Sequence, residues 1–493
     1  MEDVVEGPGL RLSSAAGRWV VAGMVLGSAV TYLAATVVNV ALPSIAQDLD
    51  ADLAGLQWVT NGYLLTLASL VLVGGSAGDI FGRRAVFLIG LATFAAATVL
   101  CALAPGLGVL VAGRLLQGLG AALMTPASLA IIDASFHPED QSRAIAAWAS
   151  GSALASSTGP FVGGWAVDQL SWRWVFFLIL PFAAATAVAV VRHVPESRAR
   201  ASGRHLDLTG AALACVAVAG VVFALVEGPG RGWSSPLVLA SGVVGVVAAA
   251  LFVGSQRRHR DPMLPLRLFE VAQFSGANGA TLLIYFAISG AFFFTALQFQ
   301  TVVGYSALAA GAALVPMNVV MIVGSPRAGA LAAAYGPRWL VTAGPLVLGA
   351  GLVWLSRVDA GADYVTDVLP PVLLVGVGLT TMVAPLTASV LAAVTPDDVG
   401  IGSAVNNAVA RTGSLLATAV LPFAAGLSGD VTPEALSSGY RRALLVCAGL
   451  CAAGAAIAAA TIGRCVELHT TQQASPTSGC GQRSLPARAD EGA

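Results

Sequence analysis

The stretch Gly75–Arg84, which reads GSAGDIFGRR, decides the fold of this chain. It lies between two long apolar runs and combines three glycines with one carboxylate and two guanidiniums. Glycine permits a positive φ in a tight turn and a close approach of helix ends, and guanidiniums bind phosphates or carboxylates. A weaker copy, GALAAAYGPR, recurs at Gly329–Arg338. A loop signature that recurs once in an apolar chain predicts two structurally related halves.

The composition is that of a membrane protein. Of the 493 residues, 57% are hydrophobic and only 10% are charged, and the mean hydropathy is +0.81. Soluble domains carry about 25% charged residues, so a soluble fold is excluded. The net charge of −1 provides no basic surface to neutralise phosphates, which excludes a nucleic-acid partner.

Fourteen apolar runs are long enough to cross a bilayer, whose hydrocarbon core of about 30 Å requires about 20 helical residues. They cover approximately residues 19–42, 56–77, 85–104, 107–132, 143–166, 174–191, 208–226, 236–255, 274–298, 307–326, 339–356, 368–392, 400–425 and 441–463. With the N-terminus inside, eighteen of the 25 arginines fall in cytosolic segments and five in outer loops. The positive-inside rule therefore predicts a multi-pass plasma-membrane protein with both termini cytosolic. A count of twelve would require that one of the two apolar runs between Arg204 and Arg257 does not cross the membrane.

The predicted fold class is an all-α polytopic membrane protein with 14 transmembrane helices. Two pseudo-symmetric six-helix halves place the two decapeptides in equivalent turns, and the seventh and eighth helices form an inserted pair. The resulting division is a cytosolic tail 1–17, a first half 18–192, a linker with the inserted pair 193–273, a second half 274–465 and a cytosolic tail 466–493. Both tails are polar, so we expect them to be disordered.

Several motifs, in order along the chain, resemble those of the major facilitator superfamily and its 14-helix drug:proton antiporter branch. They are Thr36–Pro43, Gln57–Val59, Gly75–Arg84, Arg114–Ala122, Gly159–Gly164 and Ser171–Trp174. The resemblance covers roughly residues 18–465 and implies a secondary transporter that works by alternating access. It also implies a role for three groups of residues.

The first group forms a cytosolic gate. In the family, the loop signature closes the cytosolic side, and the matching residues here are Gly75, Asp79, Gly82, Arg83 and Arg84. The alternative is a topological anchor that follows the positive-inside rule. That alternative explains the arginines, but it does not explain the spacing of the glycines around Asp79.

The second group forms a path for protons or substrate. Arg114 lies inside a helix, where a charge costs roughly 2.5–3.5 kcal/mol on insertion scales, so it should face a polar cavity or a partner. Gln117 lies three residues further on the same helix face. The remaining polar candidates within predicted helices are Asn39, Asn61, Tyr63, Asn278, Asn406 and Arg411. Asn and Gln at such places also tie helices together, and an arginine can extend to the surface; both alternatives stay open.

The third group is the antiporter helix with Gly159, Pro160, Gly163 and Gly164. Proline kinks a helix and glycines allow a close partner, and in the family this element is associated with exchange between the halves. The chain departs from the family at Ala34, where an acidic residue is common. No replacement lies in the middle of a run, and Asp133 is at a helix end. We therefore expect neutral or anionic substrates rather than lipophilic cations.

The resemblance predicts an exporter of amphipathic organic compounds, drugs or secondary metabolites, that works by alternating access in exchange for protons. The alternative is an uncoupled facilitator or importer of a small polar solute with the same fold. The five histidines lie apart in loops or a tail, and no metal-ligand motif is present, so we expect no enzyme, metal site or cofactor. The expected partners are a small-molecule substrate, protons and the lipid bilayer, with a monomeric chain.

Overall fold

The structure is a computed structural model that describes residues 9–198, 207–259, 262–395, 398–427 and 432–463. Within these residues the chain is helical throughout, and the only β pairing is an isolated bridge between Leu10 and Phe136. Long apolar segments favour helices because every backbone hydrogen bond is then satisfied inside the segment. The all-α prediction is confirmed.

The helices of the first half follow the predicted runs closely. They are α1 (Ala15–Leu49), α2 (Leu53–Phe81), α3 (Arg83–Ala102), α4 (Leu107–Ser135), α5 (Pro138–Gln169), α6 (Trp174–Phe177) and α7 (Ile179–His193). Side-chain caps fix several of the starts. The Ser14 hydroxyl accepts from Gly17 N, and the Asp52 carboxylate accepts from Gly55 N, which satisfies amide groups that have no partner within the first turn.

The remaining helices continue the pattern after residue 207. They are α8 (Leu208–Arg231), α9 (Pro236–Arg258), a 3₁₀ turn η1 (Leu266–Glu270), α10 (Ala272–Thr301), α11 (Ala307–Ala313), α12 (Val315–Tyr335), α13 (Pro337–Leu355), a π turn η2 (Tyr364–Val368), α14 (Leu369–Leu391), α15 (Val399–Ala424) and α16 (Pro433–Thr461). Each predicted run therefore coincides with one helix or with two contiguous ones.

Twelve helical segments of the described chain are long and apolar enough to cross a membrane. The other two long helices, α5 and α15, have 32 and 26 residues but are not among them. Both contain charged side chains, among them Arg143 in the second turn of α5 and Arg411 near the middle of α15. The multi-pass membrane architecture is thus confirmed, whereas the count of fourteen spans stays a prediction.

The two decapeptides occupy equivalent turns, as the repeat predicts. Gly82 separates α2 from α3 with φ +111°, and Gly336 separates α12 from α13 with φ +81°. Only glycine adopts such values without strain. The conserved element of the repeat is therefore the left-handed turn between two antiparallel helices, although the second copy lacks the carboxylate.

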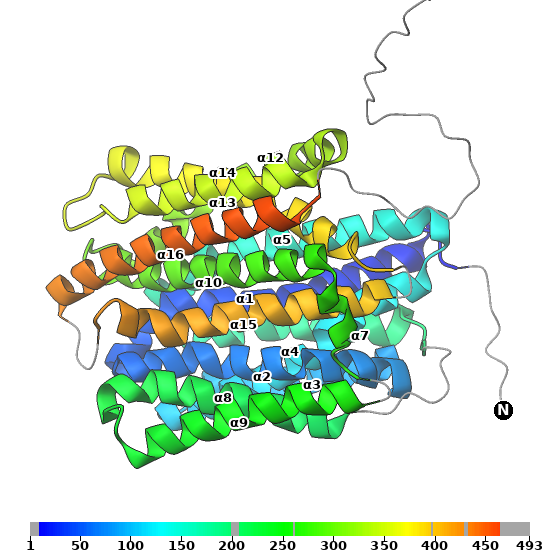
Figure 1. Ribbon diagram of the computed structural model, residues 1–493, viewed down its shortest axis with the longest axis horizontal. Coiled ribbons are helices and arrows are strands. Elements are labelled where there is room, and N and C mark those ends of the chain that lie inside the picture. Colours follow the sequence, from blue (N-terminus) through cyan, green and yellow to red (C-terminus); the bar gives the residue numbers. More distant parts are fainter. Residues whose placement is uncertain (1–8, 199–206, 260–261, 396–397, 428–431, 464–493) are drawn as a thin grey trace, which may run out of the picture.

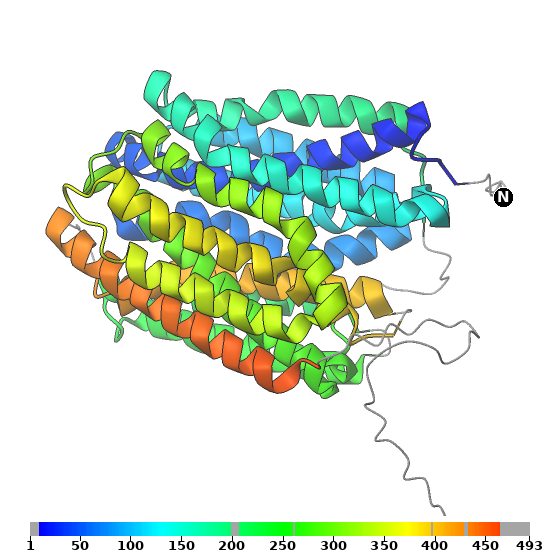
Figure 2. The same ribbon diagram turned by 90° about the horizontal axis from the view of Figure 1, so that it is seen from above.

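The helices run roughly parallel and antiparallel in one bundle (Figure 1). Seen from above, the blue and teal helices of the first half lie on one side and the yellow to red helices on the other (Figure 2). The pair α8 and α9 lies along one edge, where α8 packs on both α2 and α15. We refer to the end of the bundle where α1 begins as the near end, and to the end where α1 finishes as the far end.

The prediction of a disordered N-terminal tail over residues 1–17 is wrong for its later part. Helix α1 begins at Ala15, Leu10 forms the bridge with Phe136, and Arg11 forms an ion pair of 2.6 Å with Glu139. Neighbouring chain at the start of α5 supplies these contacts, which the composition of the tail does not reveal. Residues 1–8 and 464–493 lie outside the described residues.

Candidate functional site

The two halves meet along α1 and α2 on one side and α10 and α15 on the other. Polar contacts join them toward the far end. Gln57 Nε2 donates to Thr418 O over 2.6 Å, and Gln300 Nε2 donates to Val40 O over 3.1 Å. The Thr418 hydroxyl also donates to Asn61 Oδ1. These bonds satisfy polar side chains at a depth where water is scarce, and they hold the halves together at this end.

Arg114 of α4 is almost completely buried, with 1% of its surface exposed. Its guanidinium donates to Val59 O at 2.9 Å, to Ala34 O at 3.2 Å and to Gln117 Oε1 at 2.8 Å. The guanidinium carbon also lies 4.7 Å from the centre of the Tyr63 ring, a cation–π contact. Arg114 therefore bonds to neutral groups, and none of the ion pairs within the described residues includes it.

Gln117 and Tyr63 extend this network to two further helices. Gln117 Nε2 donates to the Thr98 hydroxyl of α3 over 2.8 Å, and the Tyr63 hydroxyl donates to Thr31 O of α1 over 3.0 Å. Arg114, Gln117 and Tyr63, three of the predicted path residues, thus form one network that joins α1, α2, α3 and α4. The expectation that Arg114 has buried polar partners is met, and they are within its own half.

Arg411 of α15 is in a different environment. It is half-buried and lies near the middle of its helix. Its guanidinium carbon is 5.5 Å from the centre of the Tyr32 ring, which belongs to α1 and hence to the other half. Tyr63 and Tyr285 lie within electrostatic range of the same guanidinium. Arg411 is therefore one of the predicted residues that lie where the two halves meet.

The four asparagines separate into two pairs of positions. Asn406 Nδ2 donates to Asn278 Oδ1 at 3.2 Å and to the Thr281 hydroxyl at 3.0 Å, which ties α15 to α10 within the second half. Asn39 and Asn61, in contrast, lie at the junction of the halves. Asn39 Oδ1 and Asn61 Nδ2 are buried without a hydrogen-bond partner in the described chain, so each has unused hydrogen-bonding capacity.

The glycines of the antiporter helix α5 lie where other helices come closest. A Cβ built on Gly163 would lie 3.0 Å from a methyl group of Val37 in α1, and one on Gly164 would lie 2.7 Å from Ala307 C in α11. Gly311 of α11 is equally restricted, since its Cβ would lie 2.7 Å from Pro160 C. Glycines on both sides thus permit backbone contact between α5 and α11, across the halves.

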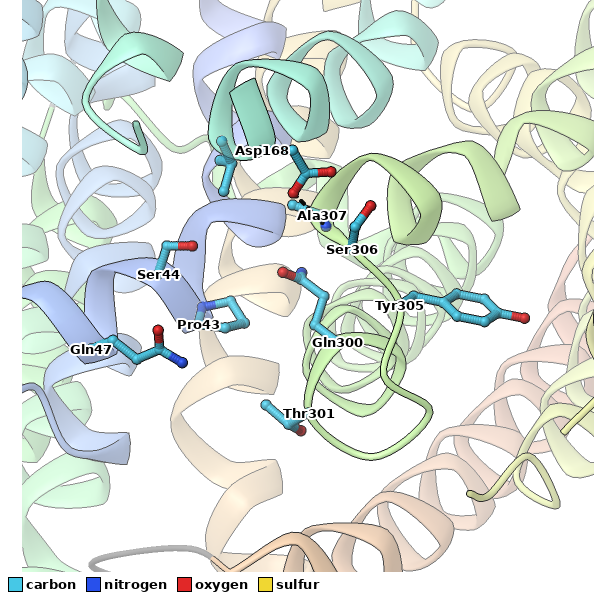
Figure 3. A pocket seen from close by; sticks show the side chains of 10 residues that line it. Pro43, Ser44, Gln47, Asp168, Gln300, Thr301, Tyr305, Ser306 and Ala307 are labelled. Carbon is cyan, nitrogen blue, oxygen red and sulfur yellow. Dashed lines mark hydrogen bonds between the residues drawn. The ribbon is translucent and has the colours of Figure 1, made fainter. Parts of the chain in front are cut away.

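A carboxylate reinforces this contact at the far end. Asp168, at the end of α5, accepts from Ala307 N at 3.0 Å and from Leu308 N at 2.8 Å, the first amides of α11. A helix start favours a negative charge because its amides lack partners within the helix. Figure 3 shows Asp168 beside Ala307 at the edge of a far-end pocket, which Gln300, Ser306 and Ser44 also line.

The residues predicted to form a gate lie at the near end, in contact with their own half. Arg83 forms an ion pair of 3.0 Å with Asp79 and donates to Ala130 O of α4. Arg84 donates to Val191 O of α7 over 2.7 Å. The carboxylate of Glu196 accepts from Arg84 N and Ala85 N, each at 3.0 Å, and so caps the start of α3.

Two carboxylates act at this turn. Glu196 accepts from the start of α3, and Asp79 pairs with Arg83. Gly75 lies beside Pro126 of α4 without overlap. Asp133 is exposed at the near end and accepts from Gln141, which separates it from the network around Arg114.

Comparison with known proteins decides the family. The sequence profile of the Major Facilitator Superfamily matches residues 24–418. This chain belongs to the major facilitator superfamily. The chain is 34% identical over 412 residues to "Multidrug resistance protein Stp" of Mycobacterium tuberculosis, covering 83% of this chain and 76% of that protein. It is 32% identical over 410 residues to "Tetracenomycin C resistance and export protein" of Streptomyces glaucescens, with the same coverage of both chains.

A solved structure agrees with the fold. The peptide transporter POT in complex with sulfate superposes with a TM-score of 0.67 over 92% of this chain and 96% of that chain, at 14% identity. Membership of the superfamily makes this protein a membrane transporter rather than an enzyme. Within the described residues, no group of three or more His, Cys, Asp or Glu side chains is arranged to hold a metal ion.

Little or nothing in the sequence indicates that three residues, Tyr32, Asp168 and Glu196, contribute to the site. Tyr32 is one aromatic among several near α1, α2 and α10. Asp168 is one carboxylate among several at helix ends. Glu196 lies in a polar segment after α7, and no pattern connects it with α3, more than 100 residues earlier. Each role depends on which helices pack together.

Proposed function

We propose that this transporter exports amphipathic organic compounds, drugs or secondary metabolites, by alternating access in exchange for protons. One observation carries the proposal: Arg411 and Tyr32, from opposite halves, face each other near the middle of their helices, between repeated units. In repeat-built transporters the substrate site lies at such a junction, near the bilayer midplane. The relatives' names, which concern multidrug resistance and the export of tetracenomycin C, support this direction of transport.

The proposed topology has fourteen spans, with α5 and α15 included and the near end in the cytosol of the cell. Both helices are long enough to span, at about 1.5 Å per residue. We divide the chain into two six-helix halves, 18–192 and 274–465, with α8 and α9 as an inserted pair in the segment 193–273. We further propose that the chain functions as a monomer in the plasma membrane.

In the proposed transport cycle, the two ends of the bundle open and close in turn. The contact of α5 with α11, together with Asp168, closes the far end, and the exchange helix with Gly159, Pro160, Gly163 and Gly164 allows it to open and close. The segment Gly75–Arg84 acts as the latch of the near end. Its bonds to α4 and α7 are within the first half, so the proposed latch acts on the second half through these helices.

Coupling to protons is the part of the proposal for which the structure supports an alternative. Arg114 has Ala34 O rather than a carboxylate as its partner, and this favours an uncoupled facilitator as the second candidate. A protonatable carboxylate is the usual carrier of the coupled proton in membranes. Coupling without it would use water organised by Arg114 and Gln117, or acids at helix ends such as Asp133.

Uptake into inverted membrane vesicles, with a panel of amphipathic compounds and an imposed pH gradient, tests the proposal. Export predicts uptake into vesicles that contain the protein and none above background in vesicles without it. Coupling predicts that collapse of the gradient reduces uptake severalfold. Uptake that is insensitive to the gradient would establish the facilitator instead.

A further inference from the structure

Arg114 and Arg411, the two arginines within the helical bundle, differ in their hydrogen-bond partners. Arg114 is buried and donates three hydrogen bonds to protein acceptors. Arg411 is half-buried, donates none to any described residue, and takes part in no described ion pair. Within the part of the chain that the structure describes, its guanidinium packs on the ring of Tyr32. A guanidinium has five donors and no acceptor, so Arg411 offers unused donors at the junction of the halves.

No ion pair among the described residues neutralises the charge of Arg411. The described carboxylates in ion pairs lie at helix ends or in connections: Asp48, Asp79, Glu139, Asp140, Glu227 and Asp398. The guanidinium instead lies against the ring of Tyr32, and Tyr63 and Tyr285 are near enough to interact with it electrostatically. Aromatic faces stabilise a cation, but they leave its net charge in place.

Further polar groups extend this site toward the far end. Thr418 lies seven residues after Arg411 on α15, and Asn39 lies seven residues after Tyr32 on α1. A spacing of seven returns to the same helix face, about 10 Å along the axis. The amide of Asn61 accepts a hydrogen bond from the Thr418 hydroxyl through its oxygen. Its nitrogen Nδ2, and the oxygen Oδ1 of Asn39, have no hydrogen-bond partner in the described chain. A bound molecule of this length would meet a cation at one end and amide groups at the other.

We propose that Arg411 binds the anionic group of the substrate, and that the transported compounds are amphipathic aromatic monoanions, chiefly carboxylates. This inference rests on the proposed function and names the class of compound that it carries. A planar guanidinium matches a carboxylate with two parallel hydrogen bonds. The rings of Tyr32 and Tyr285 provide the surface on which an aromatic body packs.

The charge balance explains why anions are preferred. An uncompensated charge inside a membrane protein is costly, and a carboxylate next to Arg411 makes the occupied site electrically neutral. An organic cation would add a third positive charge to those of Arg411 and Arg114, neither of which is in an ion pair with a described carboxylate. A neutral compound would leave the cost of Arg411 unchanged.

Transport of three compounds that share one aromatic body tests the inference. The full-length protein in proteoliposomes is given 1-pyrenebutyrate, 1-pyrenebutyramide or 1-pyrenebutylammonium, and transport is measured by pyrene fluorescence. We expect the butyrate to be transported at least tenfold faster than the ammonium compound. Arg411→Gln should slow butyrate transport roughly tenfold to a hundredfold, because a charge-assisted hydrogen-bond pair is lost, and change amide transport less than twofold.

Two further variants separate charge from folding. Arg411→Lys keeps the charge without the planar fork, and it should retain the preference for butyrate over the ammonium compound at a reduced rate. Arg257→Gln removes an exposed arginine from the end of α9 and should match the parent protein. Size-exclusion profiles in detergent show whether each variant is folded.

The outcomes distinguish this inference from the proposed function. Faster transport of the ammonium compound, or an equal loss of butyrate and amide transport in Arg411→Gln, overturns the inference but leaves an exporter. Loss of the butyrate preference in Arg411→Lys overturns it as well, since the charge is still present. Transport of none of the three compounds counts against both the inference and the proposed function.

Discussion

Arg114 Nη1 donates to the backbone carbonyl of Ala34 over 3.2 Å. This bond joins α4 to α1 at the position where members of the drug:proton antiporter branch commonly have an acidic residue, as the sequence resemblance implies. Here the arginine is satisfied by backbone carbonyls and an amide instead of a carboxylate. No described carboxylate pairs with this guanidinium, and we therefore expect it to favour anionic over cationic compounds at the junction of the halves.

Restoring the acid should therefore change the preference for charge. We expect Ala34→Asp to increase transport of 1-pyrenebutylammonium severalfold relative to 1-pyrenebutyrate, because a carboxylate beside Arg114 removes the net positive charge. Transport of the cation should also become dependent on an imposed pH gradient. Ala34→Asn, which adds a polar group of similar size without charge, is the matched control. Equal effects of Asp and Asn would show that size, rather than charge, matters at this position.

Removal of the Arg114 side chain should reduce both stability and transport. Arg114→Ala removes the charged donor from Val59 O, Ala34 O and Gln117 Oε1 in a buried place. A hydrogen bond to a charged group contributes about 1.5–3 kcal/mol. We expect a lower unfolding temperature in detergent and a loss of transport of at least tenfold. Arg257→Gln on α9 serves as the control. An unchanged unfolding temperature would show that Arg114 does not stabilise the fold. Unchanged coupled transport would show that Arg114 is not needed for transport.

The helices were predictable from sequence because hydropathy and length alone specify them. Each of the fourteen apolar runs coincides with a helix or a contiguous pair, and the repeat correctly equated Gly82 with Gly336. The partners of Arg114 were not predictable, since they are backbone carbonyls and any residue type could supply them. The contact of Arg411 with Tyr32 joins residues from opposite ends of the chain, and only the packing of α15 on the first half brings them together.

The close contact of α5 with α11 should be sensitive to any added side chain. We expect Gly164→Val to prevent closure of the far end, because a Cβ alone would lie 2.7 Å from Ala307 C. The readout is labelling of a cysteine introduced at Ser44, in the far-end pocket, by a membrane-impermeant maleimide in intact cells. Labelling should increase severalfold over the parent protein that carries Ser44→Cys. Gly254→Val is the control, since a Cβ on Gly254 meets nothing within 4 Å; a similar increase in that variant would refute the steric explanation.

The carboxylate of Asp168 should stabilise the same closed end by a different physical route. Asp168→Ala removes the acceptor for Ala307 N and Leu308 N, and loss of such a cap costs roughly 0.5–2 kcal/mol. The population with an open far end, and hence labelling at Ser44→Cys, should rise about twofold or more. Asp363→Ala removes a cap within one half, where Asp363 accepts from Val365 N and Thr366 N. If both variants raise labelling equally, the cap between the halves has no special role.

An ion pair at the near end should make the second half sensitive to acid. Arg267 of η1 donates to both carboxylate oxygens of Asp398, at 2.9 and 2.7 Å, just before α15 begins. These bonds, with one from Thr395, hold the pKa of the Asp398 carboxyl below its usual range. A lowered pKa in the folded protein stabilises the fold at pH values above the ordinary aspartate pKa of about 3.9. That stabilisation is lost as the pH falls through the lower, folded-state value.

The contribution of this pair follows from a comparison of two variants across pH. Asp398→Asn should lower the unfolding temperature in detergent by roughly 1–2 °C at pH 7, a small effect because Arg267 is largely exposed. The difference from the parent protein should shrink as the pH falls below about 4, where the parent carboxyl also becomes protonated. Asp359→Asn, in an exposed connection at the far end, should show no such convergence. A difference that is constant from pH 7 to pH 3 would mean that the charge of Asp398 does not contribute, and that Asn simply packs less well against α15.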